Sequence, residues 1–289
     1  MKERKKVAEM FIGKLGMDLR LFGGDSRSAM TNAAIITAIA LEGPAWPFEI
    51  HTRAARIAKD AKLPLVNVPS EESTFYRRIQ DLHKRQYLKA EERKGLHTGP
   101  KNSKVYDLTV KGSVVALTIS YVQNKMSDFL RWRDSEENLR LDGLKFINLM
   151  IDRGITKKLW GHFLSQALRK TLILDFEIAS HDEVRELLYA SLLQAMLKTW
   201  PQDGDRRDSV KKVTDNMKRL DVTDKEWKQF YQFYTTDPEV EQMLIDFKYA
   251  IHELHEGLPG MEMALDKAVE ALREQRKVLR EQPTSISLR

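Results

Sequence analysis

The residues best suited to bind a polyanion lie in one short segment, residues 73–82. Its apolar side chains recur at i, i+4 and i+7, which places them on one face of a helix: Phe75, Ile79 and Leu82. Thr74, Arg77 and Arg78 fall off that face. An arginine can grip a guanine edge with two hydrogen bonds, or it can hold a phosphate, which positions a protein without reading sequence. The spacing therefore predicts a helix with one side fixed to a core and a cationic side in water.

A basic β-hairpin is predicted after this helix. Residues 88–93 and 105–109 form two short extended segments, and a loop with Gly, Pro and Asn joins them. The loop has no acidic residue, and its basic side chains are Lys94, His97, Lys101 and Lys104. We expect Arg93, Lys94, Lys101 and Lys104 of this wing to meet the phosphates or the minor groove of a duplex.

The positive charge of the chain is concentrated around these two elements. The 289 residues have a formal net charge of +6, from 48 Lys and Arg against 42 Asp and Glu. Residues 51–111 alone contain 14 basic and 7 acidic residues, whereas the remainder is close to balance. Basic surface of this kind attracts polyanions through counterion release. Solvated lysines and arginines that only keep a domain soluble are the alternative that composition leaves open.

Three helices are expected before the hairpin and one after it. Residues 31–41 are almost wholly apolar, which predicts a short buried helix. A turn at 43–47 precedes a helix over 48–59, and the segment 73–86 is the third helix. The second of these should face outward through its basic residues, which are weaker candidates for nucleic acid: Arg53, Arg56 and Lys59. Thr109 then opens a fourth helix. This order of elements is that of a winged helix-turn-helix.

The rest of the chain, from about residue 121, is predicted to be helical throughout. Capping boxes at 180–183 and 223–226 mark two helix starts, and Asp237 followed by Pro238 marks a third. We therefore predict a mainly α protein. Its three parts are an N-terminal amphipathic helix at 1–26, a winged helix-turn-helix DNA-binding domain with a short β-hairpin wing at 27–120, and an all-helical domain for dimerisation or partner or effector binding at 121–289.

Four stretches share residues with one known family: Leu41-Glu42-Gly43-Pro44, Phe48-Glu49-Ile50, Ser73-Thr74-Phe75-Tyr76-Arg77-Arg78-Ile79 and Tyr106-Asp107-Leu108-Thr109-Val110-Lys111-Gly112. They resemble the PadR-type winged-helix transcriptional regulators. That family shows a glycine turn before a Tyr/Phe-Glu-Ile helix start, a Ser-Thr-Leu-Tyr-Arg recognition helix and a Tyr-x-Leu-Thr-x-x-Gly string after the wing. The resemblance covers about residues 30–118. It implies binding to operator DNA, usually as a dimer.

The chain also departs from that family. The family usually ends in a short dimerising helical segment, whereas about 170 residues follow the matching part here. Trp46-Pro47 stands where the family commonly has a glycine pair or Gly-Tyr, and the linker at 62–70 is rich in proline. The ligands of the family are not carried over, because the segment that would hold them does not match.

The residues expected to touch DNA come from the recognition helix and the wing. Thr74, Arg77 and Arg78 are expected to read sequence, and Tyr76 to pack or to bond a phosphate. The full set of candidate contacts is Ser73, Thr74, Tyr76, Arg77, Arg78, Arg93, Lys94, Lys101, Asn102 and Lys104. The expected partners are double-stranded DNA and a second copy of the chain. An unknown small-molecule effector or protein partner is left open.

No set of residues predicts catalysis. The chain has no cysteine, which excludes disulfides, thiolate metal sites and a cysteine nucleophile. Residues 252–256 (His-Glu-Leu-His-Glu) contain metal-ligand types without the His-Glu-x-x-His spacing or a third ligand, so a solvated helix face is the simpler interpretation. His162 and His181 are interpreted as structural or capping residues. We expect no enzyme, no cofactor and no metal site; a nucleic-acid enzyme would need clustered carboxylates for Mg²⁺.

Two helical patterns in the second half leave alternatives open. Aromatic residues at helical spacing predict either a core or the lining of an effector pocket: Trp227, Phe230, Tyr231, Phe233 and Tyr234. Leu265, Leu272 and Leu279 lie seven apart, which permits a short coiled-coil seam or packing within the domain. No apolar run reaches the ~18 residues of a membrane span, so we expect a cytoplasmic, nucleoid-associated protein that does not bind a membrane. A winged-helix protein–protein adaptor is the alternative function.

Overall fold

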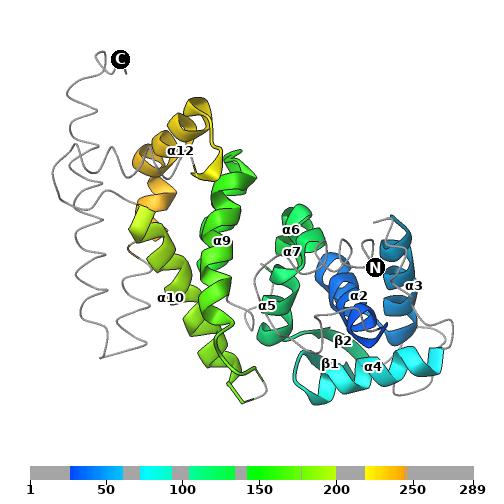
Figure 1. Cartoon of the computed structure of the whole chain (residues 1–289). Coiled ribbons are helices and arrows are strands. Elements are labelled where there is room, and N and C mark those ends of the chain that lie inside the picture. The colour runs from blue at the N-terminus through cyan, green and yellow to red at the C-terminus, as the bar shows by residue number, and fades with distance from the viewer. Residues whose placement is uncertain are drawn as a thin grey trace, which may run out of the picture. The chain divides into compact units, whose positions relative to one another are not determined.

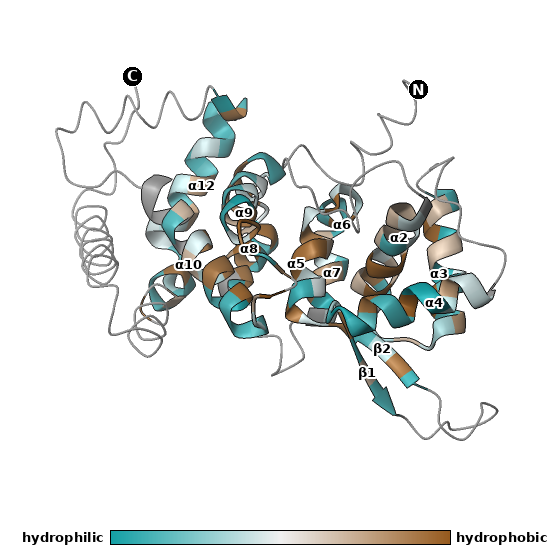
Figure 2. Cartoon of the chain, turned by 60° about the horizontal axis from the view of Figure 1, so that its bottom comes forward, coloured by the Kyte–Doolittle hydropathy of each residue, from teal (hydrophilic) through white to brown (hydrophobic). Residues whose placement is uncertain are grey.

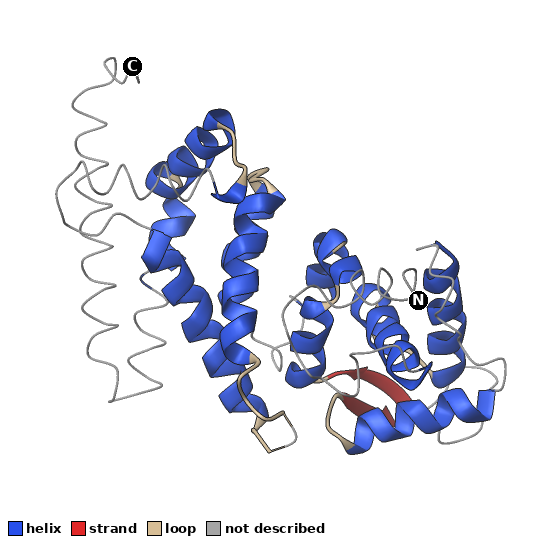
Figure 3. Cartoon of the chain, viewed as in Figure 1, coloured by secondary structure: helices blue, strands red, loops and turns tan. Residues whose placement is uncertain are grey.

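The structure, a computed structural model, is mainly helical, with a two-stranded antiparallel sheet in its described part (Figure 3). The described residues are 27–60, 72–92, 104–133, 142–176, 178–199, 219–243 and 245. The chain divides into two compact units, Met1–Leu141 with Leu168–Leu188 and Asp142–Ala167 with Tyr189–Arg289. The amphipathic helix expected at 1–26 lies outside the described residues, and the domain boundary expected at residue 120 stays a prediction.

Helix α2 (Arg27–Glu42) is the buried centre of the first unit (Figure 1). Every residue from Thr31 to Leu41 is buried, and alanine supplies four of the eleven positions, which lets neighbouring backbones approach closely. The predicted buried helix over 31–41 is confirmed, and it begins one turn earlier. The elements that pack against it are α3 (Pro47–Asp60), α4 (Glu72–Lys84), α5 (Val110–Thr118), α6 (Ser120–Asn124), α7 (Met126–Arg133) and strand β2 (Lys104–Leu108).

The turn that follows α2 requires glycine at Gly43. Its φ of 78° lies in the left-handed region, and its N–H donates to the Ile39 carbonyl at 2.9 Å. A Cβ at this position would lie 2.5 Å from the ring of Trp132. That ring belongs to α7, and its Nε1 donates to the Leu41 carbonyl at 3.0 Å. The last turn of α2 is therefore closed by α7, and the chain is turned toward α3.

Helix α3 is amphipathic as the sequence predicts. Its buried side chains are Ile50, Ala54, Ile57 and Ala58. Between α2 and α3 the chain also touches the sheet: Ala45 and Tyr106 exchange two main-chain hydrogen bonds, of 3.1 and 2.9 Å. The predicted hairpin is present, since β1 (Leu88–Glu92) pairs antiparallel with β2, with Leu88 opposite Leu108 and Glu92 opposite Lys104. The loop that joins the strands, 93–103, lies outside the described residues.

Helix α5 lies very close to the chain at Tyr87. Thr109 caps the helix, because its hydroxyl oxygen accepts from the Gly112 N–H at 3.2 Å. A Cβ at Gly112 would lie 2.1 Å from the Tyr87 carbonyl oxygen. The same oxygen accepts from the Thr109 N–H at 3.1 Å. The Leu-Thr-x-x-Gly string therefore has a physical reason here: threonine starts the helix, and glycine lets its first turn approach the backbone where β1 begins.

The second unit is built on aromatic packing. It contains α8 (Asp142–Asp152), most of α9 (Lys157–Thr171), the end of α10 (His181–Thr199) and α12 (Asp224–Thr236). Phe163 lies between two other rings, with centroids 6.2 Å from Phe146 and 5.8 Å from Phe230. Within the predicted aromatic stripe, Phe230, Phe233 and Tyr234 are buried, whereas Tyr231 is 41% exposed. Three of its five members therefore belong to a core.

Helix boundaries in the second half follow the predicted signals. Thr223 and Glu226 form a full capping box at the start of α12. Ser180 and Glu183 exchange the same pair of contacts at the start of α10, with the Ser180 N–H donating to the Glu183 carboxylate at 2.7 Å. Gly154, at φ 68°, ends α8. Among the described residues, no helix combines the length and the apolar character needed to cross a bilayer.

We expect Gly112→Ala to destabilise the protein by about 2 kcal/mol or more, because the added methyl group meets a backbone atom that cannot rotate away. Gly161→Ala is the matched control. Its Cβ would meet only the flexible Lys157 side chain, at 3.8 Å, so a helix-interior alanine should stabilise α9 by about 0.5–1 kcal/mol. Chemical denaturation of both variants measures the two shifts. If both variants changed the free energy of unfolding equally and in the same direction, the close approach of Gly112 to the Tyr87 carbonyl would be contradicted.

Candidate nucleic-acid interface

Helix α4 has a buried face and an exposed face, as the sequence predicts. Phe75, Ile79 and Leu82 are at most 1% exposed. Phe75 meets the ring of His51 on α3 edge-on, with centroids 4.8 Å apart. The exposed residues of the described helix are Ser73, Thr74, Arg77, Gln80 and Lys84. Figure 2 shows hydrophilic residues along the visible side of α4 and hydrophobic residues on α2. The helix is therefore anchored on one side and presents polar groups on the other.

The structure distinguishes the two arginines, which the spacing predicts to be equally exposed. Arg77 is exposed on the outer face. Arg78, in contrast, is half-buried, and its Nη2 donates to the Ser28 hydroxyl at 2.5 Å. Ser28 lies in the first turn of α2, so Arg78 ties α4 to the central helix. Arg77 is thus placed to reach a ligand, while Arg78 is engaged within the unit. Tyr76 is half-buried beside them.

Gln80 belongs to the exposed face, although the sequence analysis did not include it. Ser73, Arg77, Gln80 and Lys84 follow one another at intervals of four, three and four residues, which aligns them in a single row opposite the apolar anchor. The signal was present in the spacing, since Gln80 is at i+3 from Arg77. Glutamine can bond an adenine edge with two hydrogen bonds, as arginine does with guanine. We name this row of four residues the α4 row.

The end of α4 is closed by a Schellman motif with glutamine in the position that usually holds glycine. Gln86 has φ 63°; its N–H donates to the His83 carbonyl at 3.0 Å, and the Tyr87 N–H donates to the Leu82 carbonyl at 2.9 Å. Tyr87 and Leu82 are both buried, which supplies the apolar contact of this motif. The chain then passes directly into β1, so the helix and the hairpin are joined without a loose segment.

The hairpin stem is of mixed charge. Lys104 is exposed at the start of β2, and it pairs across the strands with Glu92, which is also exposed. Lys89 lies 3.7 Å from Asp107 and 3.8 Å from Glu91. The other predicted wing contacts lie outside the described residues: Arg93, Lys94, Lys101 and Asn102. Of the wing residues predicted to contact DNA, Lys104 is the one that lies in the described stem.

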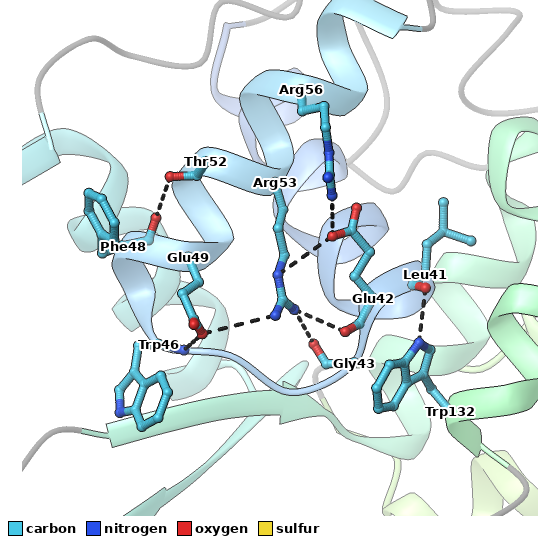
Figure 4. A network of polar contacts seen from close by, with 10 residues as sticks. All are labelled: Leu41, Glu42, Gly43, Trp46, Phe48, Glu49, Thr52, Arg53, Arg56 and Trp132. Carbon is cyan, nitrogen blue, oxygen red and sulfur yellow. Dashed lines mark hydrogen bonds and ion pairs between the residues drawn. The ribbon is translucent and has the colours of Figure 1, made fainter. Parts of the chain in front are cut away.

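Two basic residues of α3, Arg53 and Arg56, make contacts within the fold (Figure 4). Arg53 donates from Nη1 to the carbonyls of Glu42 and Gly43, at 3.0 and 2.9 Å, where α2 ends. Arg56 pairs with the Glu42 carboxylate, which also lies 3.6 Å from Arg53. The hydrogen bond and charge of Glu42 raise the pKa of Arg56. Two of the three weaker candidates are therefore engaged with the C-terminus of α2, and Lys59 is exposed.

The described residues contain no group of three or more acidic or histidine side chains that could hold a metal ion. The His-Glu-Leu-His-Glu segment at 252–256 lies outside them. His162 and His181 each meet a neighbouring polar atom: His162 lies 2.6 Å from the Gln166 amide, and His181 lies 3.3 Å from the Gln86 carbonyl. No family model, curated protein or solved structure matches this chain.

We expect Arg53→Ala to lower the free energy of unfolding by about 1–2 kcal/mol, because two helix-end carbonyls lose a charged donor. Arg56→Ala removes the same charge from an exposed pair and should cost at most about 0.5 kcal/mol. Denaturant titration of the two variants compares them. Equal stability with equal loss of DNA affinity would instead assign both arginines to a ligand surface.

Proposed function

We propose that this chain is a sequence-specific DNA-binding transcriptional regulator that acts by occupying a promoter site. Its N-terminal part would be a winged helix-turn-helix, with α3 and α4 as the helix pair, β1 and β2 as the wing, and α4 as the recognition helix. The order of these elements and the PadR-like strings support this assignment. The all-helical remainder would serve dimerisation or partner or effector contact.

The observation that carries the proposal is the α4 row. It presents an arginine, a glutamine, a serine and a lysine from a helix whose opposite face is buried in the unit. A helix of this kind can enter the major groove, where the side chains of successive turns reach successive base edges. Arg77 and Gln80 are adjacent on the row and suit guanine and adenine respectively. Ser73 and Lys84, at its two ends, suit phosphates.

A protein–protein adaptor in a nucleic-acid-associated assembly is the second candidate. The mixed charge of the hairpin stem favours it, because Glu91 and Glu92 are exposed where a duplex would bring phosphates near. Winged helices also serve as docking modules, and a fold does not fix a function. The basic residues of the loop favour DNA, since an adaptor does not need an acid-free tip.

Binding to duplex DNA should fall steeply as salt rises, with a linear dependence of log affinity on log salt concentration. Arg77→Ala should weaken binding to a preferred site about tenfold through the loss of a forked base contact. Arg131→Ala is the control, because it removes an exposed arginine of α7 in the same unit. Fluorescence anisotropy at two salt concentrations measures the DNA affinity of the wild type and of the two variants. Salt-independent binding, or equal losses in the two variants, would contradict DNA reading by α4.

Charge reversal at the wing separates the two functions. The double variant Lys101→Glu, Lys104→Glu should abolish DNA binding, because it places carboxylates against phosphates. A regulator would then fail to restore transcription control in a strain that lacks the protein, whereas an adaptor would still restore its assembly. Footprinting of the wild-type chain on genomic fragments identifies the sites. A palindromic footprint with half-sites about one helical turn apart would indicate a dimer.

A further inference from the structure

The residue that ends α4 is held by more partners than a cap requires. The Gln86 carbonyl accepts from the Thr109 hydroxyl at 2.6 Å, and the His181 Nε2 lies 3.3 Å from the same oxygen. The Gln86 side-chain oxygen accepts from the Lys111 Nζ at 3.0 Å. These partners come from three places in the sequence, 23, 25 and 95 residues away from Gln86. All of them belong to the first unit.

Lys111 is the unusual member of this group. Its side chain is 1% exposed, although lysine is rarely buried without a partner. Burial lowers the pKa of Lys111, while the carboxylates of Asp175 and Glu183 act in the opposite direction and raise it. Both acidic residues lie in the segment that precedes or opens α10. Two carboxylates from residues 168–188 therefore act electrostatically on a buried lysine next to α4, and they offset part of the effect of its burial.

A glutamine with positive φ is an unfavourable choice for a helix end, where glycine would avoid the steric cost. Glycine could not bond Lys111. The side chain of Gln86 thus has a role that the cap itself does not explain. A hydrogen bond between the end of α4 and a buried ammonium group fixes that end relative to α5, on which Lys111 lies.

Resting on the proposed function, we propose that Gln86 is a positioning residue for DNA reading. Lys111 and His181 hold Gln86, and Gln86 in turn sets the orientation of α4 within the first unit. The α4 row is thereby fixed against α5 and the start of α10. The segment 168–188 takes part in recognition without touching DNA. Its contribution is to the discrimination between sites rather than to the attraction of the phosphate backbone.

The test uses the full chain and a preferred duplex selected by the wild type from a random library. The measured quantity is the ratio of affinities for that duplex and for a scrambled duplex of equal length. Gln86→Met with Lys111→Met removes both members of the bond together, so no buried ammonium group is left without its acceptor and the thermal midpoint should change little. The ratio should fall by about tenfold or more, which corresponds to about 1.4 kcal/mol of discrimination.

Gln86→Glu is the conservative variant. It keeps an acceptor oxygen for Lys111 and should keep the ratio within about twofold of the wild type, whatever its effect on overall affinity. If Gln86 had a merely structural role, the ratio would stay unchanged in the double variant. Partial unfolding lowers the active fraction, and this weakens the apparent binding of both duplexes equally. An unchanged ratio in the double variant would overturn the proposal.

His181→Ala provides a second variant if the double variant does not fold. His181 lies at the start of α10, and its contact with Gln86 is at the surface. Its loss should lower the ratio about two- to threefold, and His181→Gln, which offers an amide donor, should restore it. An unchanged ratio in His181→Ala would overturn the proposal. A wild-type chain that selects no preferred duplex would instead refute the proposed function itself.

Discussion

The first unit depends on a helix that has almost no solvent-exposed side. Residues 31–41 of α2 are buried throughout, so every neighbouring element must find its place against the same small apolar surface. One polar residue of this stretch is accommodated locally, since the Thr37 hydroxyl donates to the Ala33 carbonyl at 2.7 Å. Because interiors are close-packed, a shift of one surrounding helix requires a shift of the others. The outer face of α4 is thus set by what its inner face packs against.

The second constraint is the short passage from α4 into the sheet. Gln86 ends the helix, Tyr87 is buried, and the Tyr87 carbonyl meets the first turn of α5 so closely that Gly112 can carry no side chain. Helix, hairpin and α5 therefore meet within a few residues. Such a junction leaves little freedom for α4 to turn about its axis. A forked contact between a guanidinium group and a base edge needs a fixed donor direction, which a loosely joined helix would not supply.

The sequence predicts the local features of this unit well and its long-range polar contacts poorly. The apolar anchor of α4, the Thr109 cap and both capping boxes follow from spacing, since each involves residues within one or two turns. The bond between Arg78 and Ser28 joins residues 50 apart, and the contact of His181 with Gln86 joins residues 95 apart. Periodicity contains no information on such pairs. It placed Arg77 and Arg78 equally outside, and the distinction between them depends on where α2 begins.

On the proposed function, a second copy of the chain would add to the few cations that the described surface offers to a duplex. The α4 row contains two cations, and Lys104 on the hairpin faces Glu92 across the strands. Phosphate neutralisation supplies much of the affinity of a DNA-binding protein, and each neutralised phosphate adds to it. The described residues of one copy would therefore neutralise few phosphates, while the arginine and glutamine of the row would still discriminate between bases. Two copies on adjacent half-sites would double the number of neutralised phosphates and the number of base contacts. The dimer would lose its rotational and translational freedom only once for both copies. A helical second half that joins two such readers would serve this requirement.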